Sequence, residues 1–122
     1  MQLQHVLDFT HRLQSLKTWA DVELETLEFL QGLGLEFFNC CTHMAKDSMR
    51  EDAILLIQYP HDWVCHYFDQ NLVWSDPVVA VVMKSMMPFF WRAPHLTSFM
   101  KEKQIQVLDD AAGYGLAHGF TI

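Results

Sequence analysis

The sequence has little positive charge. Lys and Arg total 8 against 15 Asp and Glu, so the 122-residue chain has a formal net charge of −7 at pH 7. Binding to DNA or RNA depends on cationic side chains that displace the counterions of the phosphate backbone. An acidic chain of this size would repel that backbone, which excludes nucleic-acid contact by the chain itself.

Cysteines and long apolar runs are also scarce. Cys40 and Cys41 are adjacent and Cys65 stands alone, an odd and sparse set that is typical of a reducing cytosol. The longest apolar run, residues 77–83, is far shorter than the ~20 residues of a membrane span. The N-terminus lacks the apolar core of a signal peptide. We therefore expect a cytoplasmic protein without membrane contact.

Catalytic and metal-binding motifs are absent. The sequence contains no GxSxG elbow, P-loop, HExxH pair or GxGxxG turn. Cys40, Cys41 and His43 could bind a soft metal, but alternation along a strand would send the two cysteines to opposite faces. His61 and Cys65 would share a helix face, yet two ligands are too few for zinc. The sequence therefore predicts neither a metal site nor an enzyme.

What the sequence does contain is enough apolar material for one core. Apolar residues make up 51% and aromatic residues 13%, which excludes a disordered chain. The length fits a single domain over residues 1–122.

Periodicity and capping signals predict an α+β fold, in which helices pack against a small antiparallel sheet. Expected helices cover residues 3–16, 19–32, 61–70, 78–87 and 98–114. The second is capped by Thr18, the fourth by Asp76 before Pro77, and the last by Thr97 or Ser98. Expected strands cover residues 35–43 and 53–59, antiparallel to each other across a turn at 46–52, and a third begins at Phe120.

Aromatic residues are dense between Tyr59 and Trp91, and Asp76 is the carboxylate among them. One interpretation is an aromatic core in which Asp76 only caps a helix. The other is a ligand pocket, with Tyr and Trp as apolar walls that each carry one polar tip and Asp76 as the group that orients the ligand. A carboxylate in such a wall needs hydrogen-bond donors, because a buried unpaired charge costs several kcal/mol.

Five segments together carry a family resemblance. They are Tyr-Pro-His-Asp-Trp-Val-Cys-His-Tyr (59–67), Asn-Leu (71–72), Asp-Pro-Val-Val (76–79), Pro-Phe-Phe-Trp (88–91) and Ala-Ala-Gly-Tyr-Gly-Leu-Ala-His-Gly-Phe-Thr-Ile (111–122). In order and spacing, this set resembles the autoinducer-binding domain of LuxR-type quorum-sensing regulators. The resemblance covers essentially the whole chain.

The resemblance implies that the ligand is an N-acyl-homoserine lactone, that no cofactor is needed, and that the ligand-binding residues are Tyr59, Trp63, Tyr67, Asp76, Val79 and Trp91. In this family the residue matching Tyr59 donates to the amide carbonyl, and the one matching Trp63 donates to the lactone carbonyl. Asp76 corresponds to the acceptor of the amide N–H. Tyr67 would line the acyl side and Trp91 would pack on the lactone ring, while Gly119 matches a glycine at the entry of the last strand.

The sequence departs from the family at its C-terminal end. Family members continue after the Gly-Phe-Thr-Ile strand with two more strands, a helix and a helix-turn-helix domain, in a sheet of order 2-1-5-4-3. We therefore expect a truncated domain, in which the strand at Phe120 has no neighbour and the chain pairs either with a second copy or with a full-length LuxR-type receptor.

Three functions remain open at this point. The first is lactone recognition as the sensory domain of a LuxR-type transcriptional regulator. The second is a truncated homologue that forms heterodimers with full-length LuxR-type receptors and inhibits them. A lactone-cleaving enzyme is a third alternative, which the absence of an HxHxDH-type metal cluster or an activated nucleophile disfavours.

Overall fold

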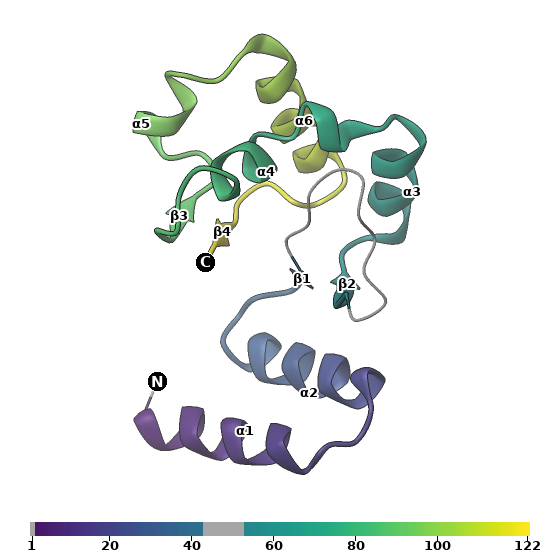
Figure 1. Ribbon diagram of the computed structural model, residues 1–122, viewed down its shortest axis with the longest axis vertical. Coiled ribbons are helices and arrows are strands. Elements are labelled where there is room, and N and C mark those ends of the chain that lie inside the picture. The colour runs from purple at the N-terminus through teal and green to yellow at the C-terminus, as the bar shows by residue number, and fades with distance from the viewer. Residues whose placement is uncertain (1, 43–52) are drawn as a thin grey trace. The chain divides into compact units, whose positions relative to one another are not determined.

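The computed structural model describes residues 2–42 and 53–122, which fall into two compact units, Met1–Tyr59 and Pro60–Ile122 (Figure 1). The turn expected at 46–52 and the candidate metal ligand His43 lie outside the described residues.

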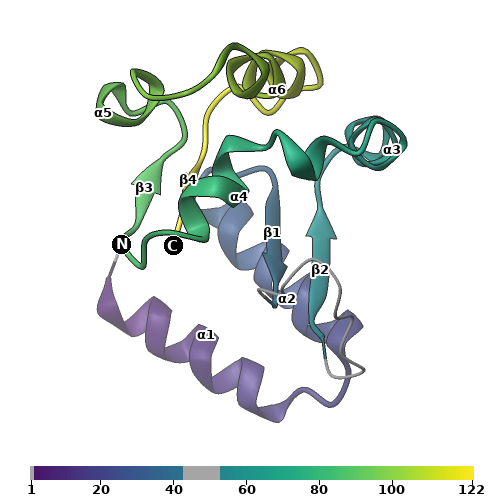
Figure 2. The same ribbon diagram turned by 45° about the horizontal axis from the view of Figure 1, so that its top comes forward.

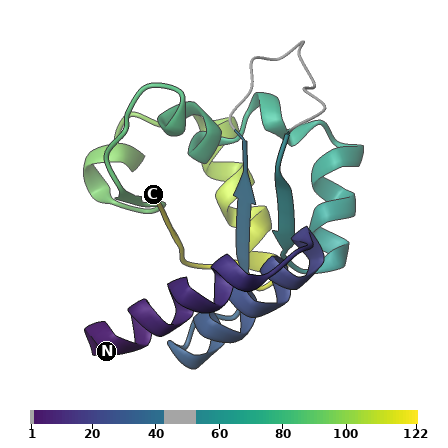
Figure 3. The ribbon, with the colours of Figure 1, turned by 60° about the horizontal axis from the view of Figure 1, so that its bottom comes forward.

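Two antiparallel helices begin the first unit, α1 (Leu3–Ser15) and α2 (Trp19–Gly32), which lie side by side in Figure 3. The rings of Phe9 and Phe29 stack between them with centroids 4.1 Å apart. Arg12 also forms an ion pair with Glu25. The Thr18 hydroxyl accepts a hydrogen bond from a backbone N–H in the first turn of α2, which confirms the predicted cap.

A two-stranded antiparallel sheet completes the first unit. Strand β1 (Phe38–Cys41) pairs with β2 (Leu55–Gln58), with Phe38 opposite Gln58 (Figure 2). The side-chain amide of Gln58 donates to Glu23 of α2 at 2.8 Å and so ties the sheet to this helix. Gly34, which follows α2, has φ +84°, a conformation that glycine adopts without strain. The two predicted antiparallel strands are thus confirmed, although both are shorter than expected.

Helices dominate the second unit. They are α3 (His61–Asp69), the 3-10 helix η1 (Leu72–Trp74), α4 (Pro77–Val82), α5 (Pro94–Thr97) and α6 (Glu102–Gly113). Pro77 and Pro94 each occupy a first helical position, where the missing N–H costs no hydrogen bond. The buried apolar side chains of this unit are Trp63, Pro77, Val107, Leu108, Ala111 and Leu116. Most of them lie on α6 or just after it, so this helix forms the centre of the second unit.

Strand β3 (Phe89–Phe90) pairs antiparallel with β4 (Phe120–Thr121), with Phe90 opposite Phe120. The expectation that the strand at Phe120 would have no neighbour is therefore wrong. Its partner is a two-residue strand after Pro88, which is too short for a periodic signal in the sequence. The described residues contain two small antiparallel sheets, and the predicted α+β class is confirmed.

Two helix boundaries differ from the prediction. Helix α4 ends at Val82 instead of continuing to 87, because the Ser85 hydroxyl binds the Met87 backbone N–H and Pro88 disfavours helix before it. The last helix begins at Glu102 instead of after Thr97. There the Gln104 side chain accepts the Lys101 backbone N–H at 2.9 Å.

No helix within residues 2–42 and 53–122 is long and apolar enough to span a membrane.

Candidate ligand-binding site

Asp76 caps helix α4. Its Oδ1 accepts the backbone N–H of Val78 at 2.9 Å, as the Asp-Pro sequence predicts. Asp76 has the extended backbone of an N-cap residue, and Pro77 behind it is fully buried. The carboxylate is therefore fixed by the backbone of the helix that it begins.

Tyr67 of α3 supplies a second donor to the same carboxylate. Its hydroxyl lies 2.7 Å from Asp76 Oδ2, the other oxygen of the group. The two carboxylate oxygens are thus held by different elements, one by the start of α4 and one by α3. This contact explains how an acidic group is tolerated in an apolar wall, because each oxygen has at least one hydrogen bond.

Burial is the main influence on the charge of Asp76. It raises the pKa of the carboxyl, while the hydrogen bonds from Tyr67 and from the backbone of Val78 and Val79 lower it. A carboxylate has about four acceptor positions. The group therefore retains capacity for a further donor, such as an amide N–H.

Trp63 packs on the ring of Tyr67, which binds this carboxylate, and is only 5% exposed. Its ring centroid lies 5.7 Å from that of Tyr67 in an edge-to-face arrangement and 5.6 Å from that of Tyr114. We call Trp63, Tyr67, Asp76 and Tyr114 the aspartate cluster. Tyr114 was assigned no role from the sequence, since its only signal was a place in the Ala-Ala-Gly-Tyr-Gly segment, far along the chain from Trp63.

Trp91 lies at a different place in the second unit, directly after β3. Its backbone N–H donates to Gly119 O at 3.0 Å, and its indole N–H donates to Thr121 Oγ1 at 3.0 Å. The next residue, Arg92, donates to Asp109 of α6 at 3.1 Å, which ties this segment to the central helix. Trp91 is half-buried and its position depends on β4.

The six residues predicted to bind ligand fall into three groups. Tyr67 binds Asp76 and packs on Trp63, and the backbone N–H of Val79 also approaches the Asp76 carboxylate. Trp91 is held separately by β4. Tyr59 follows β2 and belongs to the first unit, whereas the other five lie in the second.

A hollow of about 450 Å³ lies between α1 and α2, and none of the six predicted residues lines it. Its lining is His5, Asp8, Arg12, Glu25, Glu28, Phe29, Gly32 and Leu33. Both walls come from surface helices, and neither helix has a fully buried residue. The hollow was not predicted from the sequence.

The cysteine and histidine pair of α3 is close but isolated. His61 Nε2 lies 3.5 Å from Cys65 Sγ on the exposed face of the helix. Within the part of the chain that the structure describes, no three His, Cys, Asp or Glu side chains are grouped as metal ligands would be.

The model of the Autoinducer binding domain family matches residues 19–122. The chain belongs to the autoinducer-binding domain family. The resemblance that the five sequence segments carry is therefore confirmed. Helix α1 precedes the matched region, whereas all six predicted ligand-binding residues lie inside it.

Two curated proteins are similar to this chain: transcriptional activator protein AhyR of Aeromonas hydrophila and transcriptional activator protein AsaR of Aeromonas salmonicida. Each is 26% identical over 94 residues, which cover 76% of this chain and 36% of the relative. The chain thus matches just over a third of the length of these relatives. Membership in this family supports a sensory role for the domain.

Proposed function

We propose that residues 1–122 bind an N-acyl-homoserine lactone as the sensory domain of a LuxR-type quorum-sensing regulator. The observation that carries the proposal is the half-buried Asp76 carboxylate, which is held by Tyr67 and by the start of α4, while Trp63 packs on the Tyr67 ring. Both relatives are named transcriptional activators. We therefore include regulation of transcription in the proposal, for a protein that contains this domain.

The polar groups of the site match those of the ligand. An N-acyl-homoserine lactone has one amide N–H and carbonyl groups on the amide and the lactone, so it needs one acceptor and two donors. Asp76 supplies the acceptor. By the family resemblance Tyr59 and Trp63 would be the donors, and the Trp63 indole N–H makes no hydrogen bond to any residue that the structure describes. It is thus available to a lactone carbonyl.

The remaining predicted residues supply apolar surface. Tyr67 and Val79 flank the carboxylate and would contact the acyl chain, while the Trp91 ring would cover the lactone. Most pockets for small molecules combine such apolar walls with a few fixed polar groups. The proposal needs no metal, cofactor or catalytic step.

The direct test is calorimetric titration of the purified chain with lactones of several acyl lengths. We expect saturable binding of one lactone per chain with a preferred acyl length. The matched control is the same compound with its ring hydrolysed, which should bind more weakly because its new carboxylate would approach the negatively charged Asp76 in an acidic chain. Absence of saturable binding by every lactone, or equal binding of the hydrolysed compound, would contradict the proposal.

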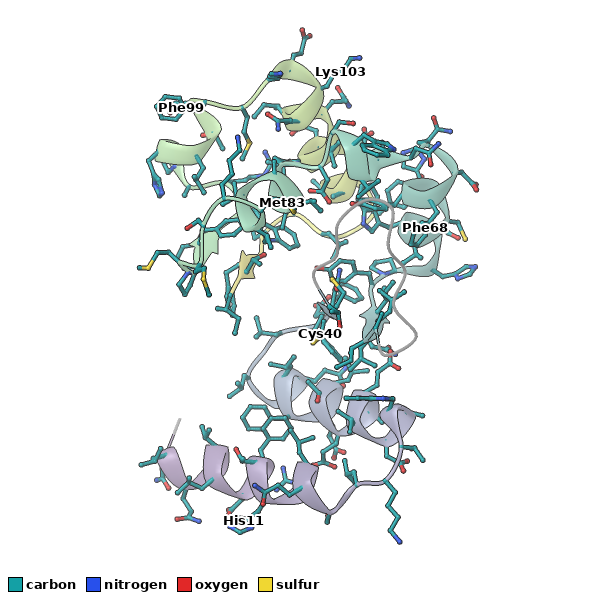
Figure 4. The ribbon with its side chains drawn as sticks, viewed as in Figure 1. His11, Cys40, Phe68, Met83, Phe99 and Lys103 are labelled. Atoms are coloured by element: carbon teal, nitrogen blue, oxygen red, sulfur yellow. The ribbon has the colours of Figure 1, made fainter. Side chains whose placement is uncertain are left out.

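Exposed apolar side chains favour a second candidate function, pairing with a LuxR-type receptor that the chain would inhibit. In the second unit the most exposed large apolar residues are Met86, Met87, Phe90, Phe99 and Ile122. Figure 4 shows Phe99 beside α5 and Phe68, 59% exposed, on α3. Apolar patches on a small domain mark interaction surfaces.

Sedimentation distinguishes the pairing modes. We expect the chain to form a homodimer alone or a heterodimer with a LuxR-type receptor, with or without lactone. A monomer in both experiments would contradict the second candidate but leave lactone binding untouched.

A further inference from the structure

The side chain of Trp91 lies directly against the backbone of Gly119. A β-carbon built on Gly119 would meet the indole atoms Cζ2, Cε2 and Cη2 at 2.5–2.6 Å, closer than real contacts of a β-carbon. Gly119 does not have a positive φ, unlike Gly34 and Gly115. Glycine is therefore required at position 119 because a side chain would clash with the Trp91 ring, and not because of the backbone conformation.

The register of β3 and β4 explains this contact. Phe90 is opposite Phe120, so Trp91 is opposite Gly119, and the Trp91 N–H continues the ladder to Gly119 O at 3.0 Å. Directly opposite residues of an antiparallel pair project on the same face, as do residues two apart on one strand. The face occupied by the Trp91 ring is thus the face of Gly119 and Thr121.

Thr121 fixes the far end of the same ring. Its hydroxyl oxygen accepts the indole N–H of Trp91 at 3.0 Å. Threonine has few χ1 rotamers, which makes it a stiff acceptor. Gly119 sets how close the ring lies to the strand, and Thr121 sets which edge of the ring faces β4. We call Trp91, Gly119 and Thr121 the indole clamp.

We propose that Gly119 and Thr121 are positioning residues, which hold the Trp91 ring in the orientation that covers the ligand. This role rests on the proposed lactone function. Because the indole N–H of Trp91 is bound to Thr121, Trp91 would contact the ligand only through the face of its ring. The donor to the lactone carbonyl is therefore Trp63. The two tryptophans thus have different roles: Trp63 donates a hydrogen bond to the lactone, and Trp91 only packs on it.

Nuclear magnetic resonance of the full chain with ¹⁵N-labelled tryptophan tests the inference without relying on ligand. The Trp91 indole signal is assigned by its loss in Trp91→Phe. In Thr121→Val, which removes the hydroxyl at nearly constant shape, we expect this signal to shift and its proton to exchange faster with water. Thr121→Ser keeps the acceptor and should restore the wild-type signal. Thr97→Val is the matched control, because the Thr97 hydroxyl lies near Pro94 O on α5.

Lactone titration of the same variants tests the link to binding. We expect Thr121→Val to weaken lactone binding about three- to tenfold, the typical effect of one lost hydrogen bond. Thr121→Ser and Thr97→Val should stay near the wild-type affinity. Gly119→Ala should displace the ring and weaken binding at least as much. Gly113→Ala is its control, because a β-carbon there meets nothing within 4 Å.

The outcomes separate this inference from the proposed function. An unchanged Trp91 signal in Thr121→Val, or a shift that Thr121→Ser does not reverse, would overturn the clamp. A shifted signal with wild-type lactone affinity would overturn its positioning role toward the ligand. If wild type binds no lactone while the Trp91 signal responds as expected, the proposed function fails, the positioning role toward a lactone fails with it, and the hydrogen bond of the clamp stands.

Discussion

The aspartate cluster and the indole clamp each hold one side chain of the proposed site in place, Asp76 and Trp91 respectively, but through different kinds of contact. Asp76 is held by α4, the helix that it begins, and by Tyr67 of α3, all within a short stretch of chain. Trp91 is held by Gly119 and Thr121, which reach it only because β3 and β4 pair. The fixing of Asp76 thus depends on local structure, and the fixing of Trp91 depends on contacts between distant segments.

The two sites also differ in exposure. Trp63 of the aspartate cluster is 5% exposed and packs on rings from α3 and from the end of α6. Trp91 is only half-buried, and both strands of its sheet expose a phenylalanine, Phe90 and Phe120. We infer that the aspartate cluster contributes to stability as well as to the proposed ligand site, whereas the indole clamp contributes mainly orientation.

The largest expected effect is on stability. Trp63→Ala should lower the free energy of unfolding by about 3–5 kcal/mol, because it leaves a cavity among the rings of Tyr67 and Tyr114. Trp19→Ala is the control, since Trp19 is 59% exposed and its loss should change stability by only about 0.5 kcal/mol. Urea unfolding followed by circular dichroism gives both values. Equal losses for the two variants would remove the stabilising role of the aspartate cluster.

A smaller effect concerns ligand affinity. Asp76→Asn should weaken lactone binding more than tenfold, because the charge-assisted hydrogen bond to the amide N–H is worth about 1.5–3 kcal/mol. The asparagine oxygen can still accept the Val78 N–H, so the helix cap and the fold should persist. Asp69→Asn, at the exposed end of α3, is the control and should bind as wild type does. If Asp76→Asn unfolds and the wild-type chain binds no lactone, Asp76 serves only as a helix cap.

Both stability and lactone affinity should depend on the protonation of Asp76. Burial raises the pKa of Asp76 in the folded chain, so its ionised form costs folding free energy near neutral pH. That cost is relieved as pH falls through the raised pKa. Lactone affinity should fall as pH is lowered through this pKa, because binding uses the ionised carboxylate. The midpoint of that fall should lie at a higher pH than the pKa of an exposed aspartate.

Tyr67→Phe should move that midpoint to still higher pH, because the Tyr67 hydrogen bond lowers the pKa of Asp76. Affinity at neutral pH should fall by about 0.5–1.5 kcal/mol. Tyr114→Phe is the matched control, since Tyr114 contacts Trp63 and His66 through its ring. Lactone titrations across pH, with carboxyl ¹³C signals for Asp76, measure both. An identical midpoint in Tyr67→Phe and wild type would mean that this hydrogen bond does not tune Asp76.

The same contrast explains how much could be predicted from the sequence. The Asp76 cap and the helices on either side follow from local chemistry, since Pro77 fixes the first helical position and the aspartate binds the next free N–H. The contact from Tyr67 needed the three-dimensional path from α3 to α4. Strand β3 was missed because two residues carry no period, and its pairing with β4 depends on a partner far along the chain. Gly119 was noted only through the family resemblance, and its steric reason appears only beside the Trp91 ring.

The proposed function depends most on Asp76 as the acceptor of the amide N–H of a lactone ligand. A thermodynamic cycle tests it, with wild type and Asp76→Asn each titrated with a lactone and with its N-methylated analogue. We expect methylation to weaken binding to wild type more than tenfold and to affect Asp76→Asn far less, because the acceptor of the lost N–H is already altered. Equal losses in the two proteins would show that the methyl group acts by bulk alone, and would contradict the assignment of Asp76.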